Sequence, residues 1–204
     1  LEFYQKKYGT ISYGVNKMYL MMEKQHNRGQ DGAGFASVRL DASPGEKYVH
    51  RRRSAGKQPI QEIFQEINNE IKNHTPLDID GNIPYIGQLM LGHVRYGTFG
   101  KNNIESVHPF LRQNNWKHRN LIVAGNFNMT NNQELFDNLV KLGQHPKDKA
   151  DGITVMEKIG HFLDDSVSKI YRKLKKEGVS KMMASALIEE RLNLSKILKK
   201  ASKD

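Results

Sequence analysis

Four short stretches of the sequence place arginine, asparagine, aspartate and glycine where a small polar ligand could bind. They read QHNRGQDGAG (residues 25–34), GHVRYGTFG (92–100), AGNFNMTN (124–131) and KADG (149–152). An arginine at the end of an apolar strand is costly to bury unless it meets an anion, and its planar fork suits a carboxylate. Asparagine side chains after a buried strand can donate to a developing oxyanion. On spacing alone a structural role is favoured for the second and third stretches, namely a salt bridge for the arginine and a helix N-cap at Thr130 or Asn131.

Other kinds of reactive site find little support in the residue types. The sequence contains no cysteine, which excludes disulfides, cysteine-ligated zinc and a thiol nucleophile among these residues. No pair of histidines has the spacing of a metal site, so we expect no metal. His93 fits a buried strand residue, and His108-Pro109 and His145-Pro146 fit turns. No Ser-His-Asp arrangement is supported by spacing.

The elements that would position these stretches are helices alternating with strands. Apolar periodicity predicts helices and strands, and turn residues separate them. The predicted helices are 13–26, 61–73, 131–142 and 153–163, and the predicted strands are 33–40, 47–53, 86–96 and 121–124. This order indicates a sheet covered by helices, followed after residue 165 by lysine-rich helices with a break near Gly178.

Charge and hydropathy narrow the protein class further. The formal net charge is +10, and residues 165–204 hold eleven Lys and Arg against five Asp and Glu. A basic surface can attract nucleic acid, but a solvated helical face is the favoured interpretation of this tail. No apolar run approaches the ~20 residues of a membrane span, and no secretory signal is visible. We expect a cytoplasmic protein without a membrane partner.

Taken together and in this order, the four stretches resemble the class II glutamine amidotransferase domain of the N-terminal-nucleophile hydrolases. Among these, they most resemble the amidophosphoribosyltransferases of purine biosynthesis. The resemblance covers roughly residues 13–163 and implies an α+β fold, the four-layer αββα sandwich. It also implies a partial glutaminase domain over residues 1–163, incomplete at both ends, and a basic helical insertion or tail over 164–204.

The resemblance implies a role for each matching residue. Arg95 would bind the α-carboxylate of glutamine, Thr98 would line the same pocket, and Asp151 would bind the α-amino group. Asn126 would form the oxyanion hole with the backbone N–H of Phe127. Arg28 and Gly29 would close the pocket from another side.

Three departures from the family pattern affect this assignment. Phe127 stands where glycine is usual, so the local backbone must suit a residue with a Cβ. Gly152 replaces a hydroxyl residue after Asp151. The family nucleophile is an N-terminal cysteine whose own α-amine acts as base, and Leu1 cannot replace it.

The expected function is therefore glutamine hydrolysis, as a fragment of an enzyme that passes ammonia to phosphoribosyl diphosphate. The resemblance implies no cofactor in this domain, with magnesium expected only in the absent phosphoribosyltransferase domain. It implies glutamine as ligand, phosphoribosyl diphosphate through the absent domain, and a homo-oligomer. Two alternatives stay open: an inactive homologue that binds glutamine or a partner, and a nucleic-acid-binding module formed by the basic tail, which is less favoured.

Overall fold

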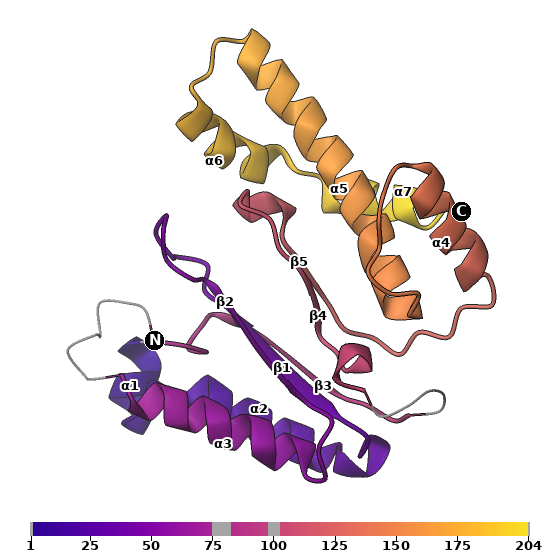
Figure 1. The fold of residues 1–204 in the computed structure, drawn as a ribbon. Helices are drawn as coiled ribbons and strands as arrows, with labels where there is room; N and C mark the ends of the chain where they lie inside the picture. The colour runs from indigo at the N-terminus through magenta and orange to yellow at the C-terminus, as the bar shows by residue number, and fades with distance from the viewer. Residues whose placement is uncertain (1, 75–82, 98–102, 204) are drawn as a thin grey trace. The chain divides into compact units, whose positions relative to one another are not determined.

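The computed structural model describes residues 2–74, 83–97 and 103–203 (Figure 1). Its contacts divide the chain into two compact units, Leu1–Pro109 and Phe110–Asp204. Within the described residues no helix is both long and apolar enough to cross a membrane.

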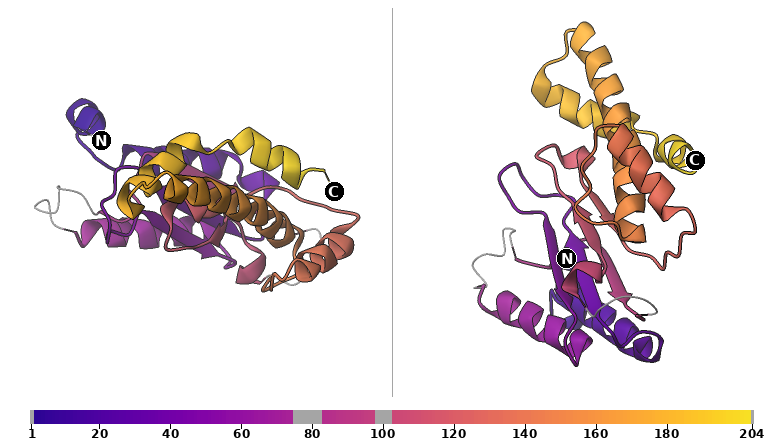
Figure 2. Two further views of the ribbon diagram at one scale, coloured as in Figure 1. Left: turned by 90° about the horizontal axis from the view of Figure 1, so that it is seen from above. Right: turned by 45° about the vertical axis from the view of Figure 1, so that its right-hand side comes forward.

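The first unit is a three-stranded antiparallel sheet with two long helices on one face (Figures 1 and 2). Its strand order is β2-β1-β3, with Ala33 of β1 paired to Ser54 of β2 and to Val94 of β3. The elements are α1 (Glu2–Tyr8), α2 (Tyr13–Lys24), the 3-10 turn η1 (His26–Arg28), β1 (Ala33–Val38), β2 (Val49–Ser54), α3 (Pro59–Lys72), β3 (Leu89–Val94) and the 3-10 turn η3 (Ile104–Ser106).

The core of this unit lies between the sheet and the helices α2 and α3. Phe35 of β1 is fully buried against Phe64 of α3, with ring centroids 5.5 Å apart. Helix α3 begins with Pro59, whose missing N–H costs nothing in the first turn. The carboxylate of Glu62 accepts hydrogen bonds from the Gln58 N–H, at 3.2 Å, and from the Ser54 hydroxyl, which ties the start of α3 to the end of β2. Fully or nearly buried side chains of the cluster are Val15, Met22, Ala33, Phe35, Ile60, Ile63, Phe64, Ile67, Tyr85 and Ile86.

The opposite face of the sheet carries the segment 107–109. Alternation along β2 places Arg51 and Arg53 on this face. Their guanidinium groups donate to the carbonyl oxygens of Pro109 at 3.2 Å and Val107 at 2.8 Å. Gly34, the β1 residue paired with Arg53, leaves the space that this segment occupies. Arg52 points to the helix side and forms ion pairs with Glu66 and Glu70 of α3.

The second unit combines a two-stranded sheet with a helical bundle. Its elements are β4 (Phe110–Arg112), the 3-10 turn η4 (Lys117–Arg119), β5 (Leu121–Val123), α4 (Asn132–Lys141), α5 (Asp151–Lys176), α6 (Lys181–Arg191) and α7 (Leu194–Ala201). Apolar side chains of α5, α6 and α7 form its core: Leu163, Val167, Leu174, Ala184, Ile188 and Ile197. Gly178, with φ of 76°, follows α5 in the left-handed conformation that ends helices.

The predicted elements are present with shifted ends, and a strand and a helix of the structure were not predicted. The predicted strand 86–96 is β3, six residues long, and the helix predicted at 153–163 is one part of the 26-residue α5. Strand β4 and helix α1 were not predicted. Because α5 continues through residue 163, the functional division into 1–163 and 164–204 has no structural boundary there and stays a prediction. Helices with small antiparallel sheets agree with a mixed α and β class.

Candidate functional site

The first group of predicted residues lies where the loop after η1 meets the end of β3. The backbone of Arg95 is held on both sides by this loop. Its N–H donates to the Gly32 oxygen at 2.7 Å, and its carbonyl oxygen accepts the Asp31 N–H at 3.0 Å. The side chain of Asp31 then accepts the Gly97 N–H at 2.7 Å. The loop therefore fixes the path of the chain as it enters and leaves Arg95.

Gly29 is required by this close approach. It is buried, and a Cβ built on it would lie 2.8 Å from the carbonyl carbons of both Val94 and Arg95. Backbone atoms cannot move aside as the end of a side chain can, so only glycine fits this crossing. Arg28, just before it, is exposed, and Arg95 is half-buried. The structure thus brings Gly29 against the backbone of Arg95, with Arg28 next to Gly29 along the chain, while Thr98 lies outside the described residues.

A stacked pair of histidines lies near Arg95. Alternation along β3 places His93 on the same sheet face as Arg95, and its ring stacks on that of His108 with centroids 4.6 Å apart. Burial, reinforced by the charges of His93, Arg95 and Arg53, lowers the pKa of His108 to about 4. Burial and the charge of Arg95 also lower the pKa of His93. Both rings are therefore neutral at physiological pH.

From this histidine pair we predict that the folded protein loses stability in mild acid. A histidine with a depressed folded pKa binds fewer protons when folded than when unfolded, so stability present above the unfolded pKa of about 6.5 falls as pH drops toward the folded value. We expect the urea midpoint to change little between pH 7.5 and about 6.5 and to fall as the pH drops further toward about 4. His108→Gln should flatten that slope, whereas His145→Gln, at an exposed position, should leave it unchanged. Equal slopes in all three proteins would contradict the prediction.

The second group of predicted residues lies where the chain after β5 meets the start of α5. Asp151 is the first residue of α5, where the positive end of the helix dipole favours a carboxylate. Its Oδ2 accepts the Met129 N–H at 2.7 Å, which ties the AGNFNMTN stretch to the helix. A carboxylate that binds one donor in this way is held in place and retains acceptor capacity on both oxygens.

The residues predicted to form an oxyanion hole lie in the same stretch. Asn126 is exposed, and Phe127 is half-buried. A Cβ on Gly125 would lie 2.6 Å from Cζ of Phe127, so the ring lies over Gly125 in space that a side chain would take. Among the described non-glycine residues, positive φ occurs at Tyr85, so Phe127 has a backbone conformation that suits its side chain.

The predicted site residues are therefore divided between the two units. Arg28, Gly29 and Arg95 belong to Leu1–Pro109, whereas Asn126, Phe127 and Asp151 belong to Phe110–Asp204. The roles assigned to them stay predictions. Sequence reasoning missed Asp31, because its part depends on a contact 66 residues away that no periodic pattern encodes.

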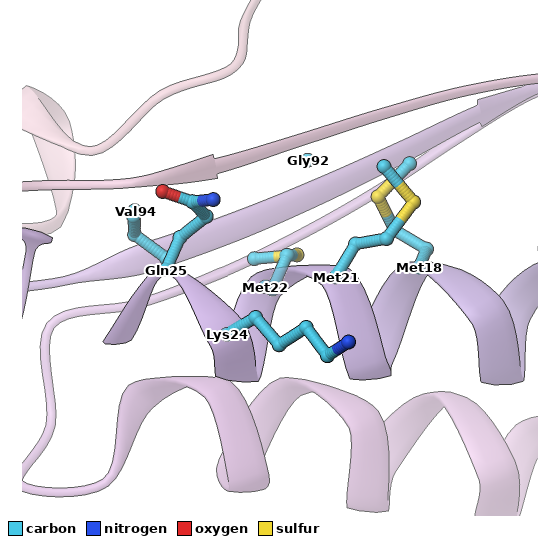
Figure 3. A pocket seen from close by; sticks show the side chains of 7 residues that line it. All are labelled: Met18, Met21, Met22, Lys24, Gln25, Gly92 and Val94. Carbon is cyan, nitrogen blue, oxygen red and sulfur yellow. The ribbon is translucent and has the colours of Figure 1, made fainter. Parts of the chain in front are cut away.

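A separate apolar pocket lies between α2 and β3 (Figure 3). Its volume is about 250 Å³, and its lining residues are Met18, Met21, Met22, Lys24, Gln25, Gly92 and Val94. The sulfurs of Met18 and Met22 approach Gly92 so closely that a Cβ there would lie 2.9 and 2.7 Å from them. None of the predicted site residues lines this pocket. In the described part of the chain, no cluster of His, Asp and Glu could hold a metal ion.

Comparison with solved structures identifies the class of fold. The chain is similar to a glutamine phosphoribosylpyrophosphate (PRPP) amidotransferase from B. subtilis complexed with ADP and GMP, with a TM-score of 0.50 and 21% identity. It is also similar to an allosteric regulatory enzyme of purine biosynthesis, with a TM-score of 0.53 and 20% identity. Each match covers 90% of this chain and 29% of the other chain. The chain thus shares the fold of part of these proteins.

Sequence comparison finds relatives named amidophosphoribosyltransferase. The chain is 26% identical over 145 residues to the amidophosphoribosyltransferase of Archaeoglobus fulgidus, covering 71% of this chain and 26% of the relative. It is 31% identical over 163 residues to that of Bacillus subtilis, covering 77% and 29%. The chain therefore spans between a quarter and a third of the length of these relatives. No family model matches it.

Proposed function

We propose that this chain is the glutamine-binding part of an amidophosphoribosyltransferase-like enzyme of purine biosynthesis. The main support for the proposal is that residues 29–32 contact the backbone of Arg95. These contacts fix the position of a half-buried arginine at the end of β3. The similarity to amidophosphoribosyltransferases over 77% of the chain supports the same assignment.

The proposed binding mode uses both ends of the amino acid. Arg95 binds the α-carboxylate through its planar fork, and Asp151 accepts from the α-ammonium group, both by charge-assisted hydrogen bonds. The proposed role of Asn126 and of the backbone N–H of Phe127 is to stabilise the tetrahedral oxyanion formed from the amide carbonyl. Loss of one such donor typically lowers the rate ~10²–10³-fold.

Hydrolysis further requires a nucleophile that these 204 residues do not contain, since none is cysteine. In the proposed mechanism an N-terminal cysteine of the mature protein attacks the amide, ammonia leaves, and water hydrolyses the thioester. The alternative is a homologue that binds glutamine without hydrolysing it. Release of glutamate and ammonia by the intact protein separates the two.

The proposed fold, location, oligomeric state and cofactor use rest on the resemblance to amidophosphoribosyltransferases. The fold would be the four-layer αββα sandwich of the N-terminal-nucleophile hydrolases, in a cytoplasmic homo-oligomer. This part would need no cofactor, and magnesium would be used with phosphoribosyl diphosphate in a phosphoribosyltransferase domain. The ammonia released here would be consumed there.

Substitution of Arg95 tests the proposal directly. A hydrogen bond to a charged group contributes about 1.5–3 kcal/mol, so we expect Arg95→Ala to weaken glutamine binding by about 10–100-fold in calorimetric titrations of the intact protein. Arg95→Lys keeps the charge but loses the fork and should give an intermediate value.

Arg39→Ala is the matched control, because Arg39 belongs to the same unit and pairs with Asp41 at 2.9 Å, away from the loop of residues 28–34. It should leave glutamine affinity unchanged. If the intact protein shows no saturable glutamine binding, the proposed function is wrong. If it binds glutamine and Arg95→Ala binds equally well, the role of Arg95 is wrong.

A further inference from the structure

Asp31 is placed to control the position of Arg95. Its backbone N–H donates to the Arg95 carbonyl oxygen at 3.0 Å, and its Oδ2 accepts the Gly97 N–H at 2.7 Å. One residue therefore binds the chain at Arg95 and again two residues later. Gly29 and Gly32 contact Arg95 through their backbones, whereas substitution of Asp31 removes a side-chain hydrogen bond.

The carboxylate of Asp31 also lies on the same side of the chain as the Arg95 guanidinium. A Cβ on Gly97 would lie 3.0 Å from Arg95 Nη1 and 3.3 Å from Asp31 Oδ2, so both groups flank one point. Gly97 leaves that point open. The hydrogen bond from the Gly97 N–H fixes the carboxylate there.

We propose that Asp31 is a positioning residue that orients Arg95 toward the α-carboxylate of the amino acid ligand. This inference rests on the proposed function for the identity of the ligand. Asp31 does not touch the ligand; it sets the backbone path through Arg95 and the side from which the guanidinium projects. Because it acts through Arg95, it should affect recognition of the carboxylate and leave the rest of the ligand's binding unchanged.

The test compares two substitutions of Asp31 in the intact protein. Asp31→Ala removes the acceptor for the Gly97 N–H, and Asp31→Asn retains an acceptor oxygen in the same position. We expect Asp31→Ala to weaken glutamine binding about tenfold and Asp31→Asn by less than about threefold, because Ala loses the charge-assisted hydrogen bond whereas Asn replaces it with a neutral one. Asp41→Ala, which removes another hydrogen-bonded aspartate of the same unit, should have no effect.

Two further readouts separate positioning from general loss of structure. Glutaminol lacks the α-carboxylate, so its weaker binding should be the same in the unsubstituted protein and in Asp31→Ala. Hydrogen exchange at the Gly97 amide should be faster in Asp31→Ala by about tenfold or more, and nearly unchanged in Asp31→Asn. Asp31→Ser, whose hydroxyl is too short to reach Gly97, replaces Asp31→Ala if that variant does not fold.

The outcomes are distinguishable. Glutamine binding that is equal in the unsubstituted protein and Asp31→Ala overturns the inference and leaves the proposed function standing. Equal losses for glutamine and glutaminol also overturn it, because the effect is then not specific to the carboxylate. If the unsubstituted protein binds no glutamine, the proposed function fails, and the Gly97 exchange rates still decide whether Asp31 holds the chain beside Arg95.

Discussion

Gly34→Ala should destabilise the first unit by about 3 kcal/mol, at the upper end of the cost of overpacking a core. A Cβ on Gly34 would lie 1.9 Å from the His108 carbonyl oxygen and 2.9 Å from Cδ of Pro109. The segment that would have to move is held by Arg53 and Arg51, whose guanidinium groups bind the carbonyl oxygens of Val107 and Pro109. The expected result is a large decrease in the urea midpoint at unchanged slope.

Gly92→Ala is the matched control for this prediction. Gly92 lies in the neighbouring strand β3, and a Cβ added there would also meet an atom at short distance, 2.7 Å away at Sδ of Met22. That sulfur belongs to a flexible side chain that lines a pocket, and methionine adapts readily. We expect a loss below about 1 kcal/mol. Equal losses for the two variants would show that the backbone contact of Gly34 does not determine the cost.

The sequence predicted most of the elements around this contact, because their apolar patterns are local. The small and apolar residues of 33–38 and the stripe of Ile60, Ile63, Phe64 and Ile67 each lie within one element. The crossing of Gly34 by residues 107–109 joins segments more than 70 residues apart. Such a contact leaves no periodic signal, and a glycine within a strand indicates only that something approaches closely.

The sequence predicted which residue types form the candidate site, but not which groups hold those residues in place. Arg95 and Asp151 were selected from their motifs, and each is held in place, by residues 29–32 and by the Met129 N–H respectively. The supporting partners are mostly backbone groups, which every residue has. Residue type therefore cannot identify them. Strand β4 was missed because three residues are too few for an alternating pattern, and, unlike the equally short but wholly apolar β5, it ends in Arg112.

Arg112→Met should destabilise the second unit by about 2–3 kcal/mol. The Arg112 guanidinium pairs with Glu157 at 3.1 Å and Asp164 at 2.6 Å, both on α5, and the three side chains are 17%, 21% and 27% exposed. Gly160 gives the arginine room, since a Cβ there would lie 2.7 Å from Nε. Breaking a fully buried pair costs about 3–5 kcal/mol, and partial exposure reduces that here.

Most of this cost should come from the carboxylates: Glu157 loses the arginine with which it pairs, and Asp164 keeps a longer ion pair with Arg119, at 3.9 Å. Adding Glu157→Gln to Arg112→Met should therefore recover part of the lost stability, even though it removes a further charge. Lys169→Ala is the control, because Lys169 pairs with Asp165 on the same helix, also at 2.6 Å, but its side chain is 59% exposed. It should cost at most about 0.5 kcal/mol. Thermal unfolding of the unsubstituted protein and the three variants tests this prediction. A double variant less stable than Arg112→Met would show that the carboxylates are not the cause of the lost stability.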